Sequence, residues 1–321
     1  MKFANRFTRR DLLGGASALG AAAMLPQTAF AKMPFAKSQV PGFSRRQLGS
    51  FEVTALLDGD LAIELKLFSG NAAEMEDVLA KSYQPSPPRS HVNAYAVNTG
   101  DKLYLVDTGT GALLGPALGR ATENLVLAGI NPDQVDAILL THLHPDHFGG
   151  MTLEGKAVYP NAEIFVSEAD AKFWLGTEAV EKAPADFKPF FLMAQAAMKP
   201  YAHRLKPLPA NGEIATGIST LPLAGHTVGH TGYIFASGNE RMLVWGDVVH
   251  NAALQFARPE WTLAFDTDPS QAAAARKRAF DMAAADRLLV AGMHLPYPGL
   301  GFVERAGAQY RFHPDFWPSK L

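Results

Sequence analysis

The 321-residue chain contains no cysteine. A thiol nucleophile, a metal site built on thiolates and a fold that relies on disulfides are therefore excluded. The sequence Gly-x-Ser-x-Gly, which surrounds the nucleophile of many serine hydrolases, is also absent. If the protein is a hydrolase, its nucleophile must come from another source.

The chain also lacks repeats, runs of like charge and low-complexity linkers. Lysine and arginine number 29 against 31 aspartate and glutamate residues, a formal net charge of −2, and they are not clustered. This balance argues against a nucleic-acid ligand. No apolar stretch is long enough to span a membrane, and we expect a single domain over residues 32–321. A chain of this length can bury a sufficient core without disulfides.

The first 31 residues have the features of an export signal. Arg9 and Arg10 precede a weakly hydrophobic stretch rich in glycine and alanine, which ends near Leu25, and Ala29-Phe30-Ala31 suits a cleavage site. Twin arginines before such a stretch are typical of a twin-arginine signal. We therefore expect a periplasmic or secreted protein whose residues 1–31 are removed.

The densest group of metal-ligand side chains is the sequence Thr-His-Leu-His-Pro-Asp-His, which follows an apolar stretch at 137–140. If that stretch is a buried strand, the extended chain beyond it places His142 and His144 on the same side. Asp146 and His147 then fall on the following turn. Neutral imidazoles and carboxylates are preferred by borderline divalent ions such as zinc, so this segment predicts a metal site.

Three other apolar stretches end in side chains of the same kind. They cover 220–223, 242–245 and 288–291, and lead respectively into His226 and His230, into Asp247, and into His294. In open α/β sheets, functional sites gather at the carboxyl ends of the strands. The four segments are therefore expected to meet at one place.

With these segments the chain resembles the metallo-β-lactamase superfamily, whose members are mostly binuclear metal hydrolases. The resemblance implies two divalent ions, one held by His142, His144 and His226, the other by Asp146, His147 and His294, with Asp247 bridging both. It also implies that Asp107 supports the site from behind, and we interpret His230 as a second supporting residue. Zinc is the expected metal, although manganese, cobalt or iron would suit the same ligands.

Within the superfamily, the chain is more similar to methyl parathion hydrolase and its lactonase and arylesterase relatives, on the stretches 51–59, 105–120 and 294–301. This likeness implies a homodimer and a pocket for a small neutral ester, lactone or phosphotriester. The implied pocket walls are Leu114, Trp174, Phe191 and Phe265, for which packing in the core is the alternative. His250 departs from the pattern, and we hypothesise that it favours lactones and aryl esters.

The fold implied by the resemblance is an αββα sandwich of two mixed sheets flanked by helices. Local patterns indicate an irregular arm at 32–50, strands near 51–57, 93–98 and 102–106, and a helix from Pro116 to Ala128. Asp268, Pro269 and Gln271 have the cap, first-turn proline and third-position glutamine that begin a helix, which is expected to end near Ala285.

Two ions held close together lower the pKa of a shared water and polarise a carbonyl or phosphoryl oxygen, so the expected nucleophile is hydroxide and the expected catalytic residues are Asp247 and His250. Three alternatives stay open: a glyoxalase-II-like thioesterase, a β-lactamase, and an exported metal-binding protein without activity. His91, His203 and His313 have no partner in these motifs and are interpreted as structural or surface residues.

Overall fold

The structure is a computed structural model that describes residues 33–208 and 212–321. The predicted export signal at 1–31 lies outside the described residues. Residues from Pro41 onward form one compact unit, and residues 33–40, which contain no helix or strand, belong to another. Among the described residues, no helix has the length and apolar character needed to cross a membrane.

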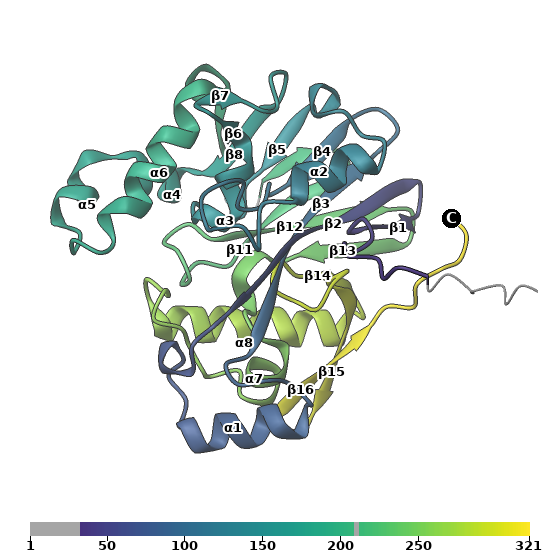
Figure 1. The fold of residues 1–321 in the computed structure, drawn as a ribbon, viewed down its shortest axis with the longest axis vertical. Helices are drawn as coiled ribbons and strands as arrows, with labels where there is room; N and C mark the ends of the chain where they lie inside the picture. The colour runs from purple at the N-terminus through teal and green to yellow at the C-terminus, as the bar shows by residue number, and fades with distance from the viewer. Residues whose placement is uncertain (1–32, 209–211) are drawn as a thin grey trace, which may run out of the picture. The chain divides into compact units, whose positions relative to one another are not determined.

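Two seven-stranded sheets form the centre of the compact unit (Figure 1). The first has the order β1-β2-β3-β4-β5-β8-β9, with β1 Phe43–Leu48, β2 Phe51–Ala62, β3 Arg89–Asn98, β4 Leu103–Val106, β5 Ala137–Leu139, β8 Glu163–Ser167 and β9 Leu205–Leu208. Neighbours from β1 to β4 are antiparallel, whereas β4, β5, β8 and β9 run parallel.

The second sheet has the order β10 to β16, with β10 Glu213–Ala215, β11 Ile218–Pro222, β12 Thr231–Ser237, β13 Glu240–Val244, β14 Leu289–Ala291, β15 Leu300–Ala306 and β16 Gln309–Pro314. Only β13 and β14 pair in parallel. A small hairpin joins β6 Thr152–Leu153 to β7 Lys156–Ala157. The mixed pairing in both sheets agrees with the predicted topology class.

Helices cover the outer faces of both sheets (Figure 1). On the side of the first sheet lie α2 Ala121–Leu127, α3 Pro145–Phe148, α4 Glu168–Leu175 and α6 Lys188–Met198, whereas α5 Thr177–Lys182 packs against α4 and α6 away from the strands. On the side of the second sheet lie α1 Ala72–Lys81, α7 Ala252–Ala257 and α8 Pro269–Ala285. Short 3-10 turns complete the chain at Leu65–Leu67, Pro132–Gln134, Gly149–Met151, Lys199–Arg204 and Gly246–Val248.

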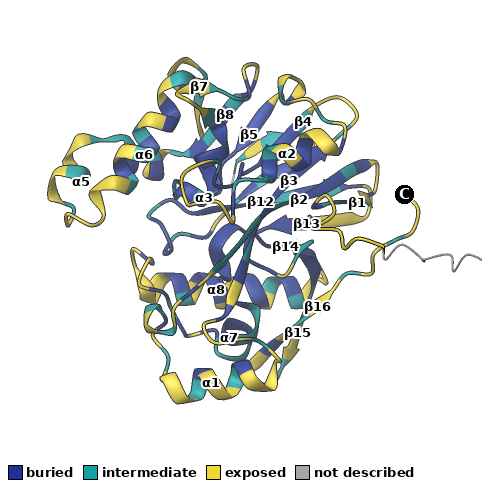
Figure 2. Cartoon of the chain, viewed as in Figure 1, coloured by how far each residue is buried: buried dark blue, intermediate teal, exposed yellow. Residues whose placement is uncertain are grey.

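Three apolar layers hold the sheets and their helices together, and a fourth apolar cluster packs α1 against α7. Side chains such as Val53, Tyr95 and Phe235 fill the space between the two sheets. Separate clusters pack the first sheet against its helices and the second sheet against α8. Figure 2 shows the buried strands between exposed outer helix faces. The predicted αββα sandwich is confirmed.

Local expectations hold at some elements and fail at others. Asp268 caps α8 by accepting the backbone N–H of Gln271 at 3.0 Å, and the helix ends at Ala285 as predicted. Residues 43–48 are not an irregular arm, because they pair with β2 as strand β1. The helix predicted from Pro116 begins at Ala121, since Asp58 binds the backbone N–H groups of Gly119 and Ala121 and keeps the preceding residues in a loop.

Candidate metal centre

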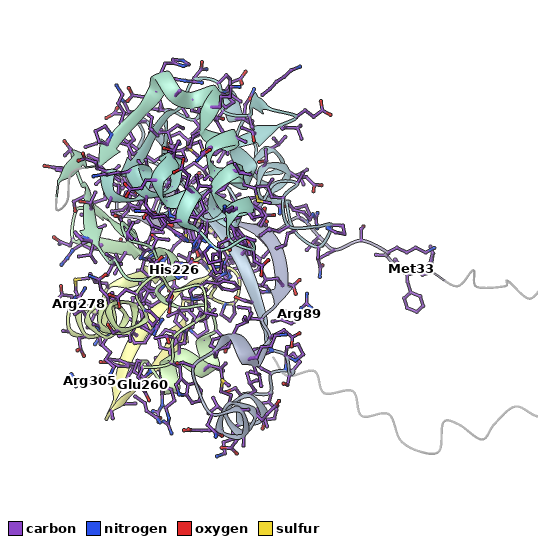
Figure 3. The ribbon with its side chains drawn as sticks, turned by 90° about the vertical axis from the view of Figure 1, so that its left-hand side faces the viewer. Met33, Arg89, His226, Glu260, Arg278 and Arg305 are labelled. Atoms are coloured by element: carbon purple, nitrogen blue, oxygen red, sulfur yellow. The ribbon has the colours of Figure 1, made fainter. Side chains whose placement is uncertain are left out.

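The predicted ligands come from loops at one edge of both sheets. His142, His144, Asp146 and His147 follow β5, His226 lies between β11 and β12, and Asp247 and His294 follow β13 and β14. In Figure 3, His226 lies in the middle of the molecule, whereas Arg278 and Arg305 point to its surface. The short helix α3 begins at Pro145, and this one turn brings Asp146 and His147 back towards the extended residues before it.

The first group consists of His142, His144, His226 and Asp247, whose ligand atoms all lie within 4.8 Å of one another. Nδ1 of His144 is 3.1 Å from Nε2 of His142 and 2.9 Å from Nε2 of His226. Oδ2 of Asp247 is 3.3 Å from Nε2 of His226. Ligands about 2.0–2.1 Å from one tetrahedral ion lie roughly 3.3 Å apart, so these spacings suit an ion at their centre.

The second group consists of Asp146, His147, His294 and again Asp247. Nε2 of His294 is 3.4 Å from Oδ2 of Asp146 and 3.2 Å from Oδ2 of Asp247. Nε2 of His147 is 3.2 Å from Oδ1 of Asp247. Asp247 is therefore shared by both groups, and all seven predicted ligands meet at one place.

Two buried atoms test whether metal ions fit these residues. Nε2 of His147 and Oδ1 of Asp247 face each other, yet neither makes a hydrogen bond within the described chain. Leaving buried polar atoms without partners is costly. Ions in the two groups would give both atoms a partner, and the donor set of imidazole nitrogens and carboxylate oxygens is one that zinc, manganese, cobalt and iron accept.

The pKa values describe the charge that the site holds by itself. Burial raises the pKa of Asp247, but the imidazoles of His147 and His294 hold it well below its ordinary range. Burial lowers the pKa of His147 and His294, but Asp247, with Asp146, raises the pKa of His147 well above normal and that of His294 to about 10. The carboxylates thus keep positive charge at this place, where divalent ions would supply it.

Comparisons with known proteins agree with this geometry. The family model of the metallo-beta-lactamase superfamily matches residues 87–294, which is more than half of the chain. The chain belongs to the metallo-β-lactamase superfamily.

Solved structures with the same fold include a hydrolase called AbOPH, described as belonging to the beta lactamase superfamily. It is 35% identical, with a TM-score of 0.84 over 88% of this chain and 100% of that chain. AidC, a dizinc quorum-quenching lactonase in complex with its product N-hexanoyl-L-homoserine, is 30% identical, with a TM-score of 0.82 over 87% of this chain and 99% of that chain.

Two curated relatives are the probable metallo-hydrolases Mb2322c of Mycobacterium bovis and Rv2300c of Mycobacterium tuberculosis. Each is 29% identical over 190 residues, which cover 48% of this chain. The match spans 56% of each relative's own length. The chain thus belongs to a superfamily that includes metal-dependent hydrolases, and lactonases are among its structural neighbours.

Asp107 holds His147 from behind, as the superfamily resemblance implied. Its Oδ2 accepts the Nδ1–H of His147 at 2.7 Å and the hydroxyl of Thr141 at 2.7 Å, while Oδ1 accepts the backbone N–H of Thr141 at 2.8 Å. This arrangement puts the proton of His147 on Nδ1 and leaves Nε2 free for an ion. Asp107 has φ +55°, a conformation that Asp and Asn tolerate better than most residues.

His230 ties two ligand loops of the superfamily site together. Its Nδ1 donates to the carbonyl of Leu223 at 3.0 Å, and its Nε2 accepts the backbone N–H of Asp247 at 2.9 Å. This pattern requires a neutral ring, and burial lowers the pKa of His230 to about 3. His230 thus fixes the backbone of the shared carboxylate.

Two further carboxylates support the site but carry no sequence signal that we identified. Asp266 accepts the Nδ1–H of His226 at 2.7 Å, which orients this ligand. Asp170 accepts N–H groups from Leu143 at 3.1 Å and Gly229 at 2.7 Å, and so joins the loop after β5 to the loop after β11. Both are buried, and both lie far in sequence from the residues that they support.

The start of β3 supports His294. The Nδ1–H of His294 donates to the backbone carbonyl of His91 at 2.8 Å, and the ring of His91 accepts the N–H of Tyr297 at 2.7 Å. Asn93 donates to the carbonyls of Gly292 and Leu295. His91 therefore belongs to the support of the site and is not an unconnected histidine.

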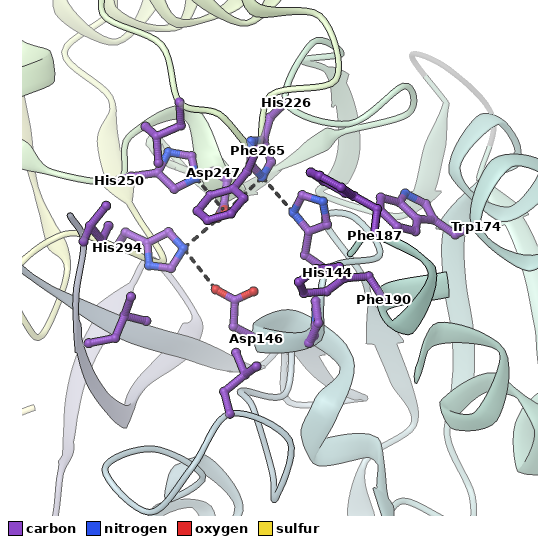
Figure 4. A pocket seen from close by; sticks show the side chains of 15 residues that line it. His144, Asp146, Trp174, Phe187, Phe190, His226, Asp247, His250, Phe265 and His294 are labelled. Carbon is purple, nitrogen blue, oxygen red and sulfur yellow. Dashed lines mark hydrogen bonds and ion pairs between the residues drawn. The ribbon is translucent and has the colours of Figure 1, made fainter. Parts of the chain in front are cut away.

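A pocket with a cavity of about 230 Å³ opens above the two ligand groups. Its apolar walls are Leu61, Ile63, Leu114, Trp174, Phe187, Phe190, Leu263 and Phe265. Figure 4 shows the aromatic side chains beside His144 and His250 beside His294. Leu114, Trp174, Phe265 and His250 line the pocket as expected from the resemblance.

Phe191, which we expected in the wall, lies one layer behind it. Its side chain is buried and packs against Trp174, with the ring centroids 4.6 Å apart. The neighbouring Phe187 and Phe190 take the place in the wall. They lie at the beginning of α6, where the period of the helix turns Phe191 towards the core.

We expect Asp107→Asn to weaken metal binding about 10- to 100-fold at the group that contains His147. The amide would present either its oxygen or its NH₂ to His147, and an NH₂ in that position would force the ring proton onto Nε2, the ligand atom. Competition titration with a chromophoric chelator measures the affinity. Asp136→Asn is the matched control, because Asp136 accepts a backbone N–H on the exposed surface. Equal affinities in both variants would contradict the role of Asp107.

Proposed function

We propose that this metal-dependent hydrolase acts on small neutral lactones and aryl esters, with phosphotriesters such as methyl paraoxon as further substrates. The single observation that carries the proposal is the lining of the pocket. None of the described residues that line it is a lysine or an arginine, and its walls are apolar up to the edge of the metal centre. A substrate without charge is the one that such walls favour.

The same observation argues against the alternatives that the sequence left open. A β-lactam carries a carboxylate, and a glutathione thioester carries charged peptide groups. Apart from the metal centre itself, the described lining offers neither substrate a lysine or an arginine to pair with, and burying an unpaired charge is costly. A protein that only carries metal has no use for an apolar pocket over the ions.

Divalent ions bound at the two groups would supply Lewis acidity and a water of lowered pKa. The chain's own residues do the remaining work. Asp247 holds both groups in one arrangement, and the Leu and Phe walls limit the access of bulk water. His250 lines the pocket with its Nε2 3.1 Å from Oδ2 of Asp247, so its ring can offer a hydrogen bond to an oxygen of a bound substrate when an ion occupies that carboxylate.

The structural neighbours support the lactone part of the proposal. AidC is a lactonase with its product bound, and it is 30% identical to this chain over most of its length. The cavity of about 230 Å³ is smaller than the roughly 300–1,000 Å³ of typical ligand pockets, which favours small substrates with short acyl chains. The twin arginines at the start of the sequence support a periplasmic or secreted location, and the resemblance supports a zinc-containing homodimer.

A substrate panel tests the proposed function. We expect protein loaded with a measured amount of zinc to hydrolyse dihydrocoumarin, phenyl acetate and methyl paraoxon with kcat/KM at least about 100-fold above that for a cephalosporin or a glutathione thioester. A factor of 100 corresponds to about 2.7 kcal/mol, within the cost of burying an unpaired charge. Faster turnover of the anionic substrates would overturn the proposal.

His250 is expected to set the preference between the neutral substrates. A polar group beside the metal centre suits the alkoxide or phenoxide that leaves from a lactone or aryl ester, whereas an apolar group suits a bulkier phosphotriester. We expect His250→Leu to lower the rate ratio of dihydrocoumarin to methyl paraoxon about 100-fold, the lower end of the usual contribution of one positioned proton donor. An unchanged ratio would refute this role.

A further inference from the structure

Arg276 is a buried cation that the proposed chemistry does not use. It lies on α8 and is 1% exposed. Its Nε donates to the carbonyl of Val248 at 2.6 Å, and its Nη1 donates to the carbonyls of Pro259 at 2.8 Å and Trp261 at 3.0 Å. No carboxylate forms an ion pair with it within the described chain. Burial lowers the pKa of Arg276 to about 10, so the group stays charged at neutral pH.

The carbonyls that Arg276 binds belong to two segments that build the site. Val248 follows Asp247 directly and lies in the turn that leads to His250. Pro259 and Trp261 begin the loop that carries Leu263 and Phe265 into the pocket wall. One guanidinium therefore joins the turn that holds the shared carboxylate to the loop that lines the pocket.

The same loop is connected to the metal ligands at its far end. Asp266 accepts the Nδ1–H of His226 at 2.7 Å and the N–H of Leu263 at 2.8 Å. The backbone N–H of Thr267 donates to the carbonyl of His226 at 2.9 Å. The loop is thus held at one end by Arg276 and at the other by a predicted ligand of the first ion.

Gln255 makes a second connection beside Arg276. Its Oε1 accepts the N–H of His250 at 2.6 Å, and its Nε2 donates to the carbonyl of Trp261 at 3.0 Å. The carbonyl of Trp261 therefore receives hydrogen bonds from both side chains. Two independent links between the same pair of segments restrict their relative movement more than either could alone.

An apolar side chain would serve packing better than a charged one at this position. The buried neighbours of Arg276 on α8 are Ala272, Ala275, Ala279 and Phe280. Removing a charge from water costs free energy, which the hydrogen bonds that the charged group makes must offset. We propose that Arg276 is a positioning residue, which fixes the Asp247 turn and the pocket-wall loop in one arrangement. Its effect on turnover rests on the proposed function, whereas its effect on the metal centre does not.

The test compares Arg276→Met and Arg276→Lys with Val303→Ala, a destabilising change in the same apolar layer against α8 that removes no hydrogen bond to either segment. Full-length variants are loaded with cobalt(II), whose visible spectrum reports ligand geometry, and are measured well below their unfolding temperatures. We expect altered band positions or intensities in Arg276→Met, a smaller change in Arg276→Lys, and the wild-type spectrum in Val303→Ala. We also expect KM for phenyl acetate to rise about tenfold in Arg276→Met with a smaller change in kcat.

Each outcome decides the question. Wild-type spectra in both Arg276 variants would overturn the proposal and leave Arg276 a structural residue. If Arg276→Met does not fold, Arg276→Lys is judged by the same spectrum, because lysine keeps the charge but cannot bind both segments with a fork of donors. If the wild-type protein hydrolyses no ester at all, the proposed function fails while the cobalt spectra still decide the role of Arg276.

Discussion

Asp247→Asn should reduce kcat/KM for phenyl acetate by about 10³-fold or more and leave the protein with fewer than two bound ions per chain. Asp247 is the one predicted ligand that belongs to both groups, and its negative charge would lower the repulsion between two dications held there. Asparagine keeps the size of the side chain but presents a single neutral oxygen. Its NH₂ would face the imidazoles of His142, His226 or His294 and could not bind a metal ion.

Kinetics combined with elemental analysis of the purified variant measures this effect. Asp281→Asn is a suitable control, because that carboxylate pairs with Arg305 at 3.1 Å on the surface, away from the site. The side chain of Asp247 is fully surrounded, and its backbone N–H remains bound by His230 in the variant, so the loop should keep its place. An active Asp247→Asn protein with two ions would show that the bridging role is wrong.

The two groups of side chains that could hold metal ions could be predicted from sequence because each of them follows an apolar strand within a few residues. Strands β11, β13 and β14 run in the same direction in their sheet and so end at one edge of it. A pattern of only a few residues, such as His142 to His147, therefore indicates both the kind of side chain and its place. The fold could be predicted for the same reason and through the resemblance. Strand β1 was not predicted, because Arg45 and Arg46 interrupt the apolar pattern that is typical of a strand. This strand forms through its pairing with β2.

The supporting residues could not be predicted because long-range contacts define them. Asp266 lies 40 residues from His226, and Asp170 lies 27 residues from Leu143 and 59 from Gly229. Nothing near them in sequence distinguishes them from ordinary surface aspartates. Arg276 lies in an alanine-rich helix whose sequence predicts only the helix itself. The folded structure alone shows that these groups are buried and which atoms they bind.

The pocket wall could be predicted from the sequence only in part. The resemblance indicated that aromatic residues near 174–191 shape the substrate site, and Trp174 does so. Which of the phenylalanines faces the cavity depends on the rotation of α6 about its axis. Ala194, Ala197 and Met198 set that rotation, because they pack in the apolar layer between the first sheet and its helices. Phe190 therefore faces the pocket, whereas the next residue, Phe191, points into the core.

Removing the metal should abolish ester hydrolysis and lower the unfolding temperature by about 10 °C or more. A ligand held at 1,000 times its Kd stabilises the native state by about 4 kcal/mol, and two such ions contribute roughly twice that. For a domain of this size, 1 kcal/mol corresponds to about 2–4 °C. Protons on His147, His226 and His294 replace part of the lost charge, so the metal-free protein should be weakened but still folded.

Chelation followed by calorimetry and an assay with phenyl acetate measures both effects in one sample. Adding zinc, manganese, cobalt or iron separately to the metal-free protein then shows which ion restores turnover. This experiment is needed because nitrogen and oxygen ligands bind all four metals. The two readouts separate the remaining possibilities. Stabilisation by metal without turnover of any ester, lactone or phosphotriester would favour a metal-binding protein, whereas full turnover in metal-free protein would contradict the role of the seven ligands.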